Sequence, residues 1–291
     1  MRAGSVRAGE FTRRRPASCP LGGAISLAPT SESPSATIDD ANRKGVRTRF
    51  HGIARRYHGR MARPLRAADG GYVYHALNRS SGRVTLFDKD ADFEAFERVL
   101  QQAVERTRMR LLAYCVMPNH WHLVVWPRKD GDLSRFVGWL SFTHTLRWHA
   151  HRHSAGTGHV YQGRFKSFPV QEDDHFLTLC RYVERNALRA GLVRRAELWR
   201  WCSLWRRESG SAAERAILSA WPIGPPRRWL EIVNKAQTPA EIEAVREAMQ
   251  RGRPFGSEPW TKSAARRLNL ESTMRPRGRP PKMPEEREKG S

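Results

Sequence analysis

The stretch MRLLAYCVMPNHWHLVVWP, residues 109–127, decides the fold because it holds two short apolar runs with a turn between them. The runs are Met109–Pro118 and His120–Pro127, and each is typical of a β-strand. Pro118-Asn119 is a tight-turn signal. The two strands are therefore predicted to be antiparallel neighbours in one sheet.

The segments on both sides alternate between strand and helix patterns. Apolar residues recur at helical spacing in three of them, and the third is followed by Gly191, a favourable residue just beyond a helix end. Beyond the strand pair, strands are predicted at 72–78 and 160–170. Helices are predicted at 90–107, 133–152 and 173–190. Strict β-α-β alternation is absent, so the order predicts an α+β domain, with an antiparallel sheet flanked by helices.

His120-Trp121-His122 lies on the second strand of the pair. With a side-chain period of two, both imidazoles point to one face and could share a metal ion, while Trp121 points into the core. Taken alone, such a pair is more often a surface or packing feature than a metal site. His149, His151 and His153 lie at helical spacing and point in different directions, which indicates a basic helix end.

Two further groups of polar residues are candidates for catalysis or binding. Tyr182 and Asn186 are four residues apart on the third helix, so they share a face at the edge of its apolar stripe. The helix alone favours a half-buried tyrosine with its hydroxyl in water. Arg164 and Lys166 share a strand face that suits phosphates, and an ordinary solvated strand face is an equally good interpretation.

The composition indicates a polyanionic partner. The 291 residues include 52 Lys and Arg against 29 Asp and Glu, a formal net charge of +23. Nucleic acid is the first candidate and an anionic membrane surface the second. No apolar run approaches the ~18 residues of a membrane-spanning helix. The four cysteines form no CxxC pair, which excludes a zinc ribbon and suits a reducing compartment, so we expect a cytoplasmic protein.

Three sequence patterns together resemble one family. They are MPNHWHLVVWP, GHVYQGRFKS and RYVERNALRAGLV, and they resemble the single-tyrosine HUH transposases, most closely the REP-associated tyrosine transposases. HUH stands for His-hydrophobic-His. The resemblance runs from about Met61 to about Trp205 and implies a ferredoxin-like HUH domain over residues 61–208.

The resemblance also implies roles for individual residues. His120 and His122 match the metal ligands, Asn186 matches the polar third ligand, and Tyr182 matches the nucleophile. The implied reaction uses a divalent ion, Mg²⁺ or Mn²⁺, to cut single-stranded DNA beside a hairpin and leave a 5′-phosphotyrosine. Two departures leave open whether this copy is active. Ala187 replaces the proline that usually follows the asparagine, and His149 stands where the family often has asparagine.

The two ends lie outside this domain. Residues 1–60 are rich in Arg, Ser, Gly, Pro and Ala, and they predict a disordered basic extension, or a mis-assigned start if translation begins at Met61. Residues 209–291 predict a separate basic, helical or disordered DNA-binding tail. Its helices are expected at 238–250 and from Ser257 to about 268, and it contains two Arg-Gly-Arg-Pro sequences, at 251–254 and 277–280. Each resembles a minor-groove AT-hook core, and binding by charge alone is the equal alternative.

The predicted DNA-binding residues are spread over domain and tail: Arg164, Lys166, Arg189, Arg277 and Arg279. Both a monomer and a homodimer remain open. The main alternative function is a non-catalytic, domesticated protein that binds nucleic-acid repeats. A zinc-dependent hydrolase is a third hypothesis, but the HxH pair has no Glu or Asp close by to act as a base.

Overall fold

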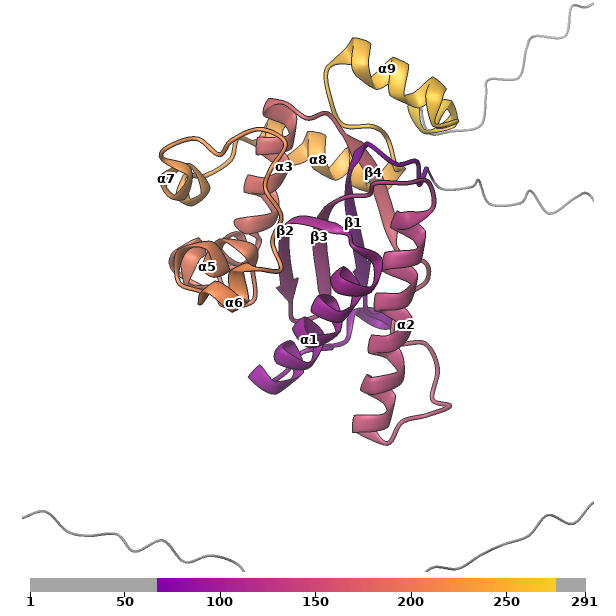
Figure 1. The fold of residues 1–291 in the computed structure, drawn as a ribbon, viewed down its shortest axis with the longest axis vertical. Coiled ribbons are helices and arrows are strands. Elements are labelled where there is room, and N and C mark those ends of the chain that lie inside the picture. The colour runs from indigo at the N-terminus through magenta and orange to yellow at the C-terminus, as the bar shows by residue number, and fades with distance from the viewer. Residues whose placement is uncertain (1–66, 276–291) are drawn as a thin grey trace, which may run out of the picture. The chain divides into compact units, whose positions relative to one another are not determined.

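A four-stranded antiparallel sheet forms the centre of the described part of the chain, which is residues 67–275 of a computed structural model (Figure 1). The strand order is β2-β3-β1-β4. The bounds are β1 (Val73–Arg79), β2 (Arg110–Met117), β3 (His120–Trp126) and β4 (Lys166–Val170). The antiparallel sheet with flanking helices confirms the predicted α+β class, and the β2–β3 hairpin confirms the predicted strand pair.

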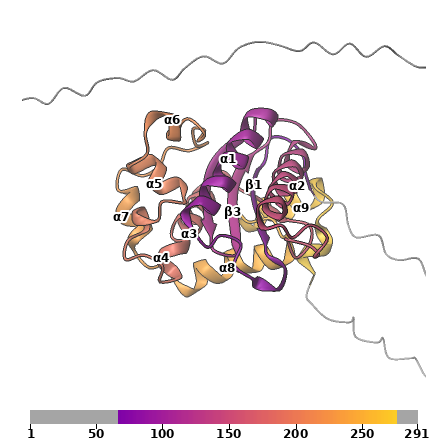
Figure 2. The same cartoon turned by 90° about the horizontal axis from the view of Figure 1, so that it is seen from below.

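Helices cover both faces of the sheet, so two hydrophobic cores form. On one face, α1 (Asp90–Thr107) and α2 (Asp132–Arg152) pack against Trp121 and its neighbours, as predicted for this indole. On the other face lie α3 (Asp174–Glu184) and α4 (Asn186–Arg189). Figure 2 shows α1 and α2 on the side of the sheet away from α8.

The C-terminal region folds against the sheet instead of forming the separate unit that the sequence suggested. Its helices are α5 (Ser203–Glu208), α6 (Ala212–Arg215), α7 (Trp229–Asn234), α8 (Pro239–Arg251) and α9 (Glu258–Arg267). Short 3₁₀ turns complete the elements: η1 (Ser81–Arg83), η2 (Ala196–Leu198) and η3 (Glu271–Met274). Buried residues of α7 and α8 belong to the core on the α3 face, and those of α9 join the α1–α2 core.

The sequence at 251–254 also differs from its predicted AT-hook form, because it lies at the end of a helix. Thr238 and Glu241 form the predicted capping box of α8. Arg251 ends α8 and Gly252 has a φ of 70°, the left-handed conformation that glycine favours at a helix end. The sequence at 251–254 is therefore a helix end and not an extended AT-hook. Residues 1–60 and 277–280, with their predicted disorder and DNA contacts, lie outside the described residues.

Two predicted elements are shorter than expected. The strand expected at 160–170 covers only Lys166–Val170, because Gly163 breaks the ladder and Tyr161 turns inward. The Tyr161 hydroxyl there accepts a hydrogen bond from Trp121 Nε1 at 3.0 Å and lies 2.8 Å from His144 Nδ1. The helix expected at 173–190 is interrupted at Arg185, between α3 and α4.

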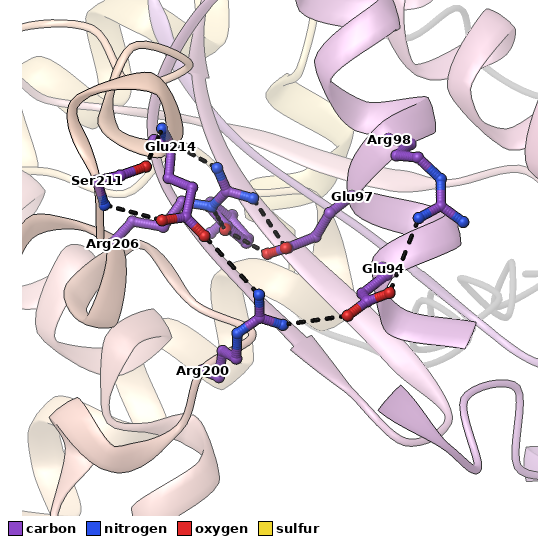
Figure 3. A network of polar contacts seen from close by, with 8 residues as sticks. Glu94, Glu97, Arg98, Arg200, Arg206, Ser211 and Glu214 are labelled. Atoms are coloured by element: carbon purple, nitrogen blue, oxygen red, sulfur yellow. Dashed lines mark hydrogen bonds and ion pairs between the residues drawn. The ribbon is translucent and has the colours of Figure 1, made fainter. Parts of the chain in front are cut away.

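A buried ionic network ties α1 and β2 to α5 and α6 (Figure 3). Arg206 donates to Glu97 at 2.8 Å and to the backbone carbonyl of Glu214 at 2.7 Å. Tyr114 donates its hydroxyl to Glu97 at 2.5 Å and accepts a hydrogen bond from Arg206. Arg200 extends the network to the surface. Every charged group at its centre has a partner, as a buried ion pair requires.

Within the described residues, none of the helices combines the length and the apolar character that crossing a membrane requires.

Candidate active site

His120 and His122 point to the same face of β3, as their spacing predicts. Their ring centroids are 5.0 Å apart with an interplanar angle of 79°. In the β1–β3 register, His120 lies opposite Arg79 and His122 lies opposite Leu77. This is the face that α3 and α4 cover, so the two imidazoles face the helix pair that carries Tyr182 and Asn186.

The ring of His120 is oriented by Asn119. Asn119 donates from Nδ2 to the carbonyl of Arg83 at 3.3 Å, and its Oδ1 lies 2.6 Å from His120 Nδ1. An amide oxygen only accepts, so Nδ1 of His120 carries the proton. Nε2 of His120 then keeps its lone pair. This Nδ1-protonated tautomer is the one that a metal ligand needs.

The ring of His122 is held by a third histidine that the sequence analysis did not single out. Nε2 of His75, on β1, lies 2.9 Å from Nδ1 of His122. A metal ion on Nε2 of His122 requires the tautomer in which Nδ1 donates to His75. Nδ1 of His75 is buried without a hydrogen-bond partner among the described residues. His75 carries no local sequence signal, because its role arises only from the sheet register.

All three histidines are neutral at physiological pH. Burial lowers the pKa of His75 to about 3. Burial, reinforced by the positive charges of Arg79 and Arg189, lowers the pKa of His120 to about 4. Burial and the neighbouring His120 hold the pKa of His122 well below its usual range. Neutral imidazole is the form that binds metal ions.

Tyr182 and Asn186 come together with the histidines although a helix break separates them. Arg185 forms the junction between α3 and α4 with φ −82° and ψ −2°, close enough to helical geometry that the four-residue spacing still aligns the two side chains. The ring centroid of Tyr182 is 6.1 Å from that of His122. Both Tyr182 and Asn186 are 6% exposed. The half-buried tyrosine expected from the helix alone is instead a largely buried side chain that lines a cleft.

Arg189 completes this group. Its guanidinium carbon lies 4.0 Å from the ring centroid of Tyr182, a cation–π contact. It donates to Asn186 Oδ1 at 2.7 Å and to the backbone carbonyl of Tyr182 at 3.2 Å. Asn186 Nδ2 is buried without a hydrogen-bond partner among the described residues. Arg189 therefore fixes the direction of the Asn186 amide and places a positive charge on the tyrosine ring.

The donor set fits a divalent ion. Both ring nitrogens that remain after the Asn119 and His75 contacts are Nε2 atoms, and Asn186 Oδ1 has a second lone pair beside its bond from Arg189. Among the described residues, no group of three or more His, Cys, Asp or Glu side chains could hold a metal. The third ligand would therefore be a neutral amide oxygen. Such a ligand is more typical of a Mg²⁺ or Mn²⁺ site than of a structural zinc site.

These residues lie in a cleft of about 1080 Å³ whose charged lining is entirely positive. The cationic residues are Arg79, Arg164, Lys166, Arg189, Arg246 and Arg251. No described residue that lines the cleft is Asp or Glu. The structure thus brings the predicted Arg164, Lys166 and Arg189 to the same cleft as Tyr182. It adds Arg79 and the two arginines of α8, which the sequence analysis did not assign to the site.

The histidines at the end of α2 take no part in this cleft. His149 contacts Ser154 through Nδ1 at 2.9 Å, in the last turn of the helix. His151 and His153 are exposed. None of the three lines the cleft, and all lie at the end of α2 as predicted.

Comparison with known proteins adds a family to this geometry. Residues 70–186 match the family model described as "Transposase IS200 like". The structure of the REP-associated tyrosine transposase bound to a REP hairpin is 16% identical over 61% of this chain and 93% of that chain, with a TM-score of 0.44. A structure described as a transposase from Deinococcus radiodurans is 19% identical over 38% of this chain and 88% of that chain, with a TM-score of 0.30. Among curated proteins, none matches the chain.

The matched segment contains the whole four-stranded sheet and ends on Asn186. It therefore contains the paired histidines of β3, Tyr182 of α3 and Asn186, all of which line the cleft. Residues 70–186 are thus similar to the IS200-like transposases.

Proposed function

We propose that the chain is a transposase that cuts and rejoins single-stranded DNA through a covalent bond to Tyr182, in DNA transposition or the mobilisation of repeat elements. The observation that carries the proposal is the position of Tyr182, beside two neutral histidines in a cleft with six cationic side chains and no carboxylate among the described residues. A polyanion is the ligand that such a charge distribution attracts. We expect the protein to act in the cytoplasm.

The reaction conserves the energy of the bond that it breaks. The Tyr182 oxygen attacks the scissile phosphorus, the bond between phosphorus and the 3′ oxygen breaks, and a 5′-phosphotyrosine and a free 3′-hydroxyl result. Attack of another 3′-hydroxyl on the phosphotyrosine rejoins the strands and frees the tyrosine. One phosphoester replaces another at each step, so the cycle needs no ATP.

His120, His122 and Asn186 are the residues that would hold a divalent ion, Mg²⁺ or Mn²⁺. When bound, the ion supplies polarisation of the scissile phosphate. The protein's own contribution is orientation: Asn119 and His75 set the two imidazole rings, and Arg189 sets the Asn186 amide. Such supporting contacts keep ligands in place for chemistry.

The cationic side chains bind the strand. Arg164 and Lys166 lie at the start of β4, and Arg189 lies beside the nucleophile. Arginine side chains bind phosphate oxygens through charge-assisted hydrogen bonds. Arg277 and Arg279 stay predicted DNA contacts of the tail, and a hairpin beside the cut stays an expectation from the family resemblance.

The experiment that tests the proposal looks for the covalent adduct. The full chain is incubated with labelled single-stranded hairpins and Mn²⁺ or Mg²⁺, and a denaturing gel separates free DNA from protein-linked DNA. We expect an adduct that protease digestion removes and that EDTA prevents. A domesticated protein that only binds nucleic acid predicts the same DNA binding without any adduct, and full adduct formation in EDTA would contradict the metal site.

A further inference from the structure

Helix α8 forms part of the catalytic cleft although it lies beyond the family match. Its buried residues Val245 and Ala248 join the same core as Tyr182. Directly after it, Phe255 pairs in parallel with Val170 at the edge of β4, and its backbone donates to Pro169 at 2.9 Å. The helix is thus attached to the strand that carries Lys166, and its last turns line the cleft.

The same segment is fixed to the helix of the nucleophile. Arg181 on α3 donates to the carbonyls of Lys235 and Ala236, at 2.9 and 3.0 Å, and pairs with Glu241 at 3.4 Å. Arg185 donates to the carbonyls at the end of α7, among them Val233 at 3.0 Å. These two arginines are occupied by the C-terminal region and hold α7 and α8 in place against α3.

Arg246 differs from the other arginines near it. It is exposed, lines the cleft, and has no hydrogen bond or ion pair with any described residue. Arg251 and Arg253, at the end of the same helix, both pair with Glu247, at 3.9 and 3.1 Å. Glu247 neutralises the arginines at the end of α8, whereas Arg246 has no partner among the described residues.

Arg246 also lies close enough to Arg189 for their charges to interact. Burial lowers the pKa of Arg189, and the positive charge of Arg246 adds to that shift. Arg189 and Arg246 thus line the same cleft, whose described lining holds no carboxylate. An anion between or beside them would remove the repulsion, and arginine pairs phosphate oxygens bidentately.

We propose that Arg246 binds a backbone phosphate of the single-stranded DNA in the cleft, so that α8 is part of the DNA track. The inference rests on the proposed function, because it takes the strand that Tyr182 cuts as the anion. It makes the C-terminal region a component of the site and not an accessory that adds affinity from outside.

The test measures salt-dependent binding in a protein that cannot cut. Tyr182→Phe is the parent, and the probe is a labelled oligothymidylate of about 16 nucleotides, the upper end of the length that one single-strand-binding module covers. Loss of one phosphate contact lowers the slope of log K against log salt by about 0.7 for single strands. We expect this change in the Arg246→Gln variant and little change in Arg246→Lys.

Arg253→Gln is the matched control, because Arg253 lies near the same helix end but is ion-paired and does not line the cleft. It should leave the slope unchanged, and thermal melting should show that all variants are folded. An Arg246→Gln slope equal to that of the parent overturns the inference. Tighter binding of oligouridylate than of oligothymidylate, with the same dependence on Arg246, would overturn the assignment to DNA.

A second measurement locates the contact. A neutral methylphosphonate replaces one phosphate of the oligonucleotide at a time. We expect one position at which this replacement weakens DNA binding by the parent but not by the Arg246→Gln variant. Failure of the proposed function gives a different result. The unmodified chain then forms no adduct, whatever the salt slope of the Arg246→Gln variant. Adduct formation together with an unchanged Arg246→Gln slope and no such position would refute only the inference.

Discussion

The molecule contains two tyrosine–arginine pairs that are built alike and surrounded differently. Arg206 lies 5.8 Å from the ring centroid of Tyr114, and Arg189 lies 4.0 Å from that of Tyr182. Around the first pair, Glu97 accepts from both partners and neutralises the arginine (Figure 3). Around the second pair no described cleft residue is acidic. A carboxylate therefore distinguishes a cluster that stabilises the fold from one that is open to an anionic ligand.

The largest expected effect separates the two tyrosines by function. Tyr182→Phe removes the oxygen that we propose as the nucleophile and keeps the ring, so the covalent adduct should vanish while DNA binding and the melting temperature change little. Tyr114→Phe should do the opposite: Glu97 and Arg206 each lose a partner, which costs about 1–3 kcal/mol of folding stability, while the adduct persists. The adduct gel and chemical unfolding measure the two outcomes. An adduct in Tyr182→Phe would contradict the assignment of the nucleophile.

The next effect tests whether Glu97 is the structural element of the comparison. Glu97→Ala leaves Arg206 buried without its counter-ion, and breaking a buried pair in this way costs about 3–5 kcal/mol. Urea unfolding of the purified variant measures that loss. Glu94→Ala is a suitable control, because the described partners of Glu94 are the partly exposed Arg98 and Arg200, and its loss should cost at most about 1 kcal/mol. Equal costs for the two variants would refute the distinction.

A smaller effect should follow from neutralising the arginine of the cleft. Arg189→Gln removes the charge beside Tyr182 and leaves Asn186 without its orienting donor. Loss of one preorganised donor to a developing charge lowers a rate about 100-fold, or about 2.7 kcal/mol. Single-turnover adduct formation at saturating DNA measures it. A rate equal to that of the unmodified chain would mean that the cation–π contact is only a packing feature.

The last effect appears only under acid conditions, because the cleft face has buried histidines and the ionic network has none. A histidine whose folded pKa is lowered binds its proton more readily when unfolded, so its contribution to stability is complete above the unfolded pKa of about 6.5 and declines as the pH falls toward the folded value. For His75 that value is about 3 and for His120 about 4. We expect a loss of about 1.4 kcal/mol per pH unit for each histidine below about pH 6. Stability that stays constant in metal-free protein down to about pH 5 would contradict neutral, buried histidines.

The sequence predicted the parts of the molecule whose signals are local. The strand pair around Pro118-Asn119 and the helix at 90–107 follow from period and turn chemistry, and the structure has both. The motifs that contain His120, His122, Tyr182 and Asn186 are local too, and the four residues line one cleft because the sheet places β3 against α3. Their roles as metal ligands and nucleophile stay predictions.

The parts that the sequence did not predict depend on long-range contacts. His75 contacts His122 only because β1 pairs with β3 in one register. Arg79 faces the cleft for the same reason. The sequence at 251–254 resembles an extended DNA-binding motif, but packing of α8 against the α3 face turns it into a helix end. Charge and proline content alone do not reveal that the residues after 208 share cores with the catalytic domain.

The position of β3 in the sheet has an evolutionary consequence. β3 is hydrogen-bonded on both sides, to β2 and to β1, so the histidine pair lies on an interior strand of the sheet. Tyr182 lies on a helix that is held from outside by side chains reaching to α7 and α8. Mutations in those two helices can therefore displace Tyr182 from the histidines while the sheet and its histidines stay in place. In a lineage of such proteins, substitutions in the C-terminal helices would therefore disrupt the arrangement of Tyr182 and the two histidines before they disrupted the fold.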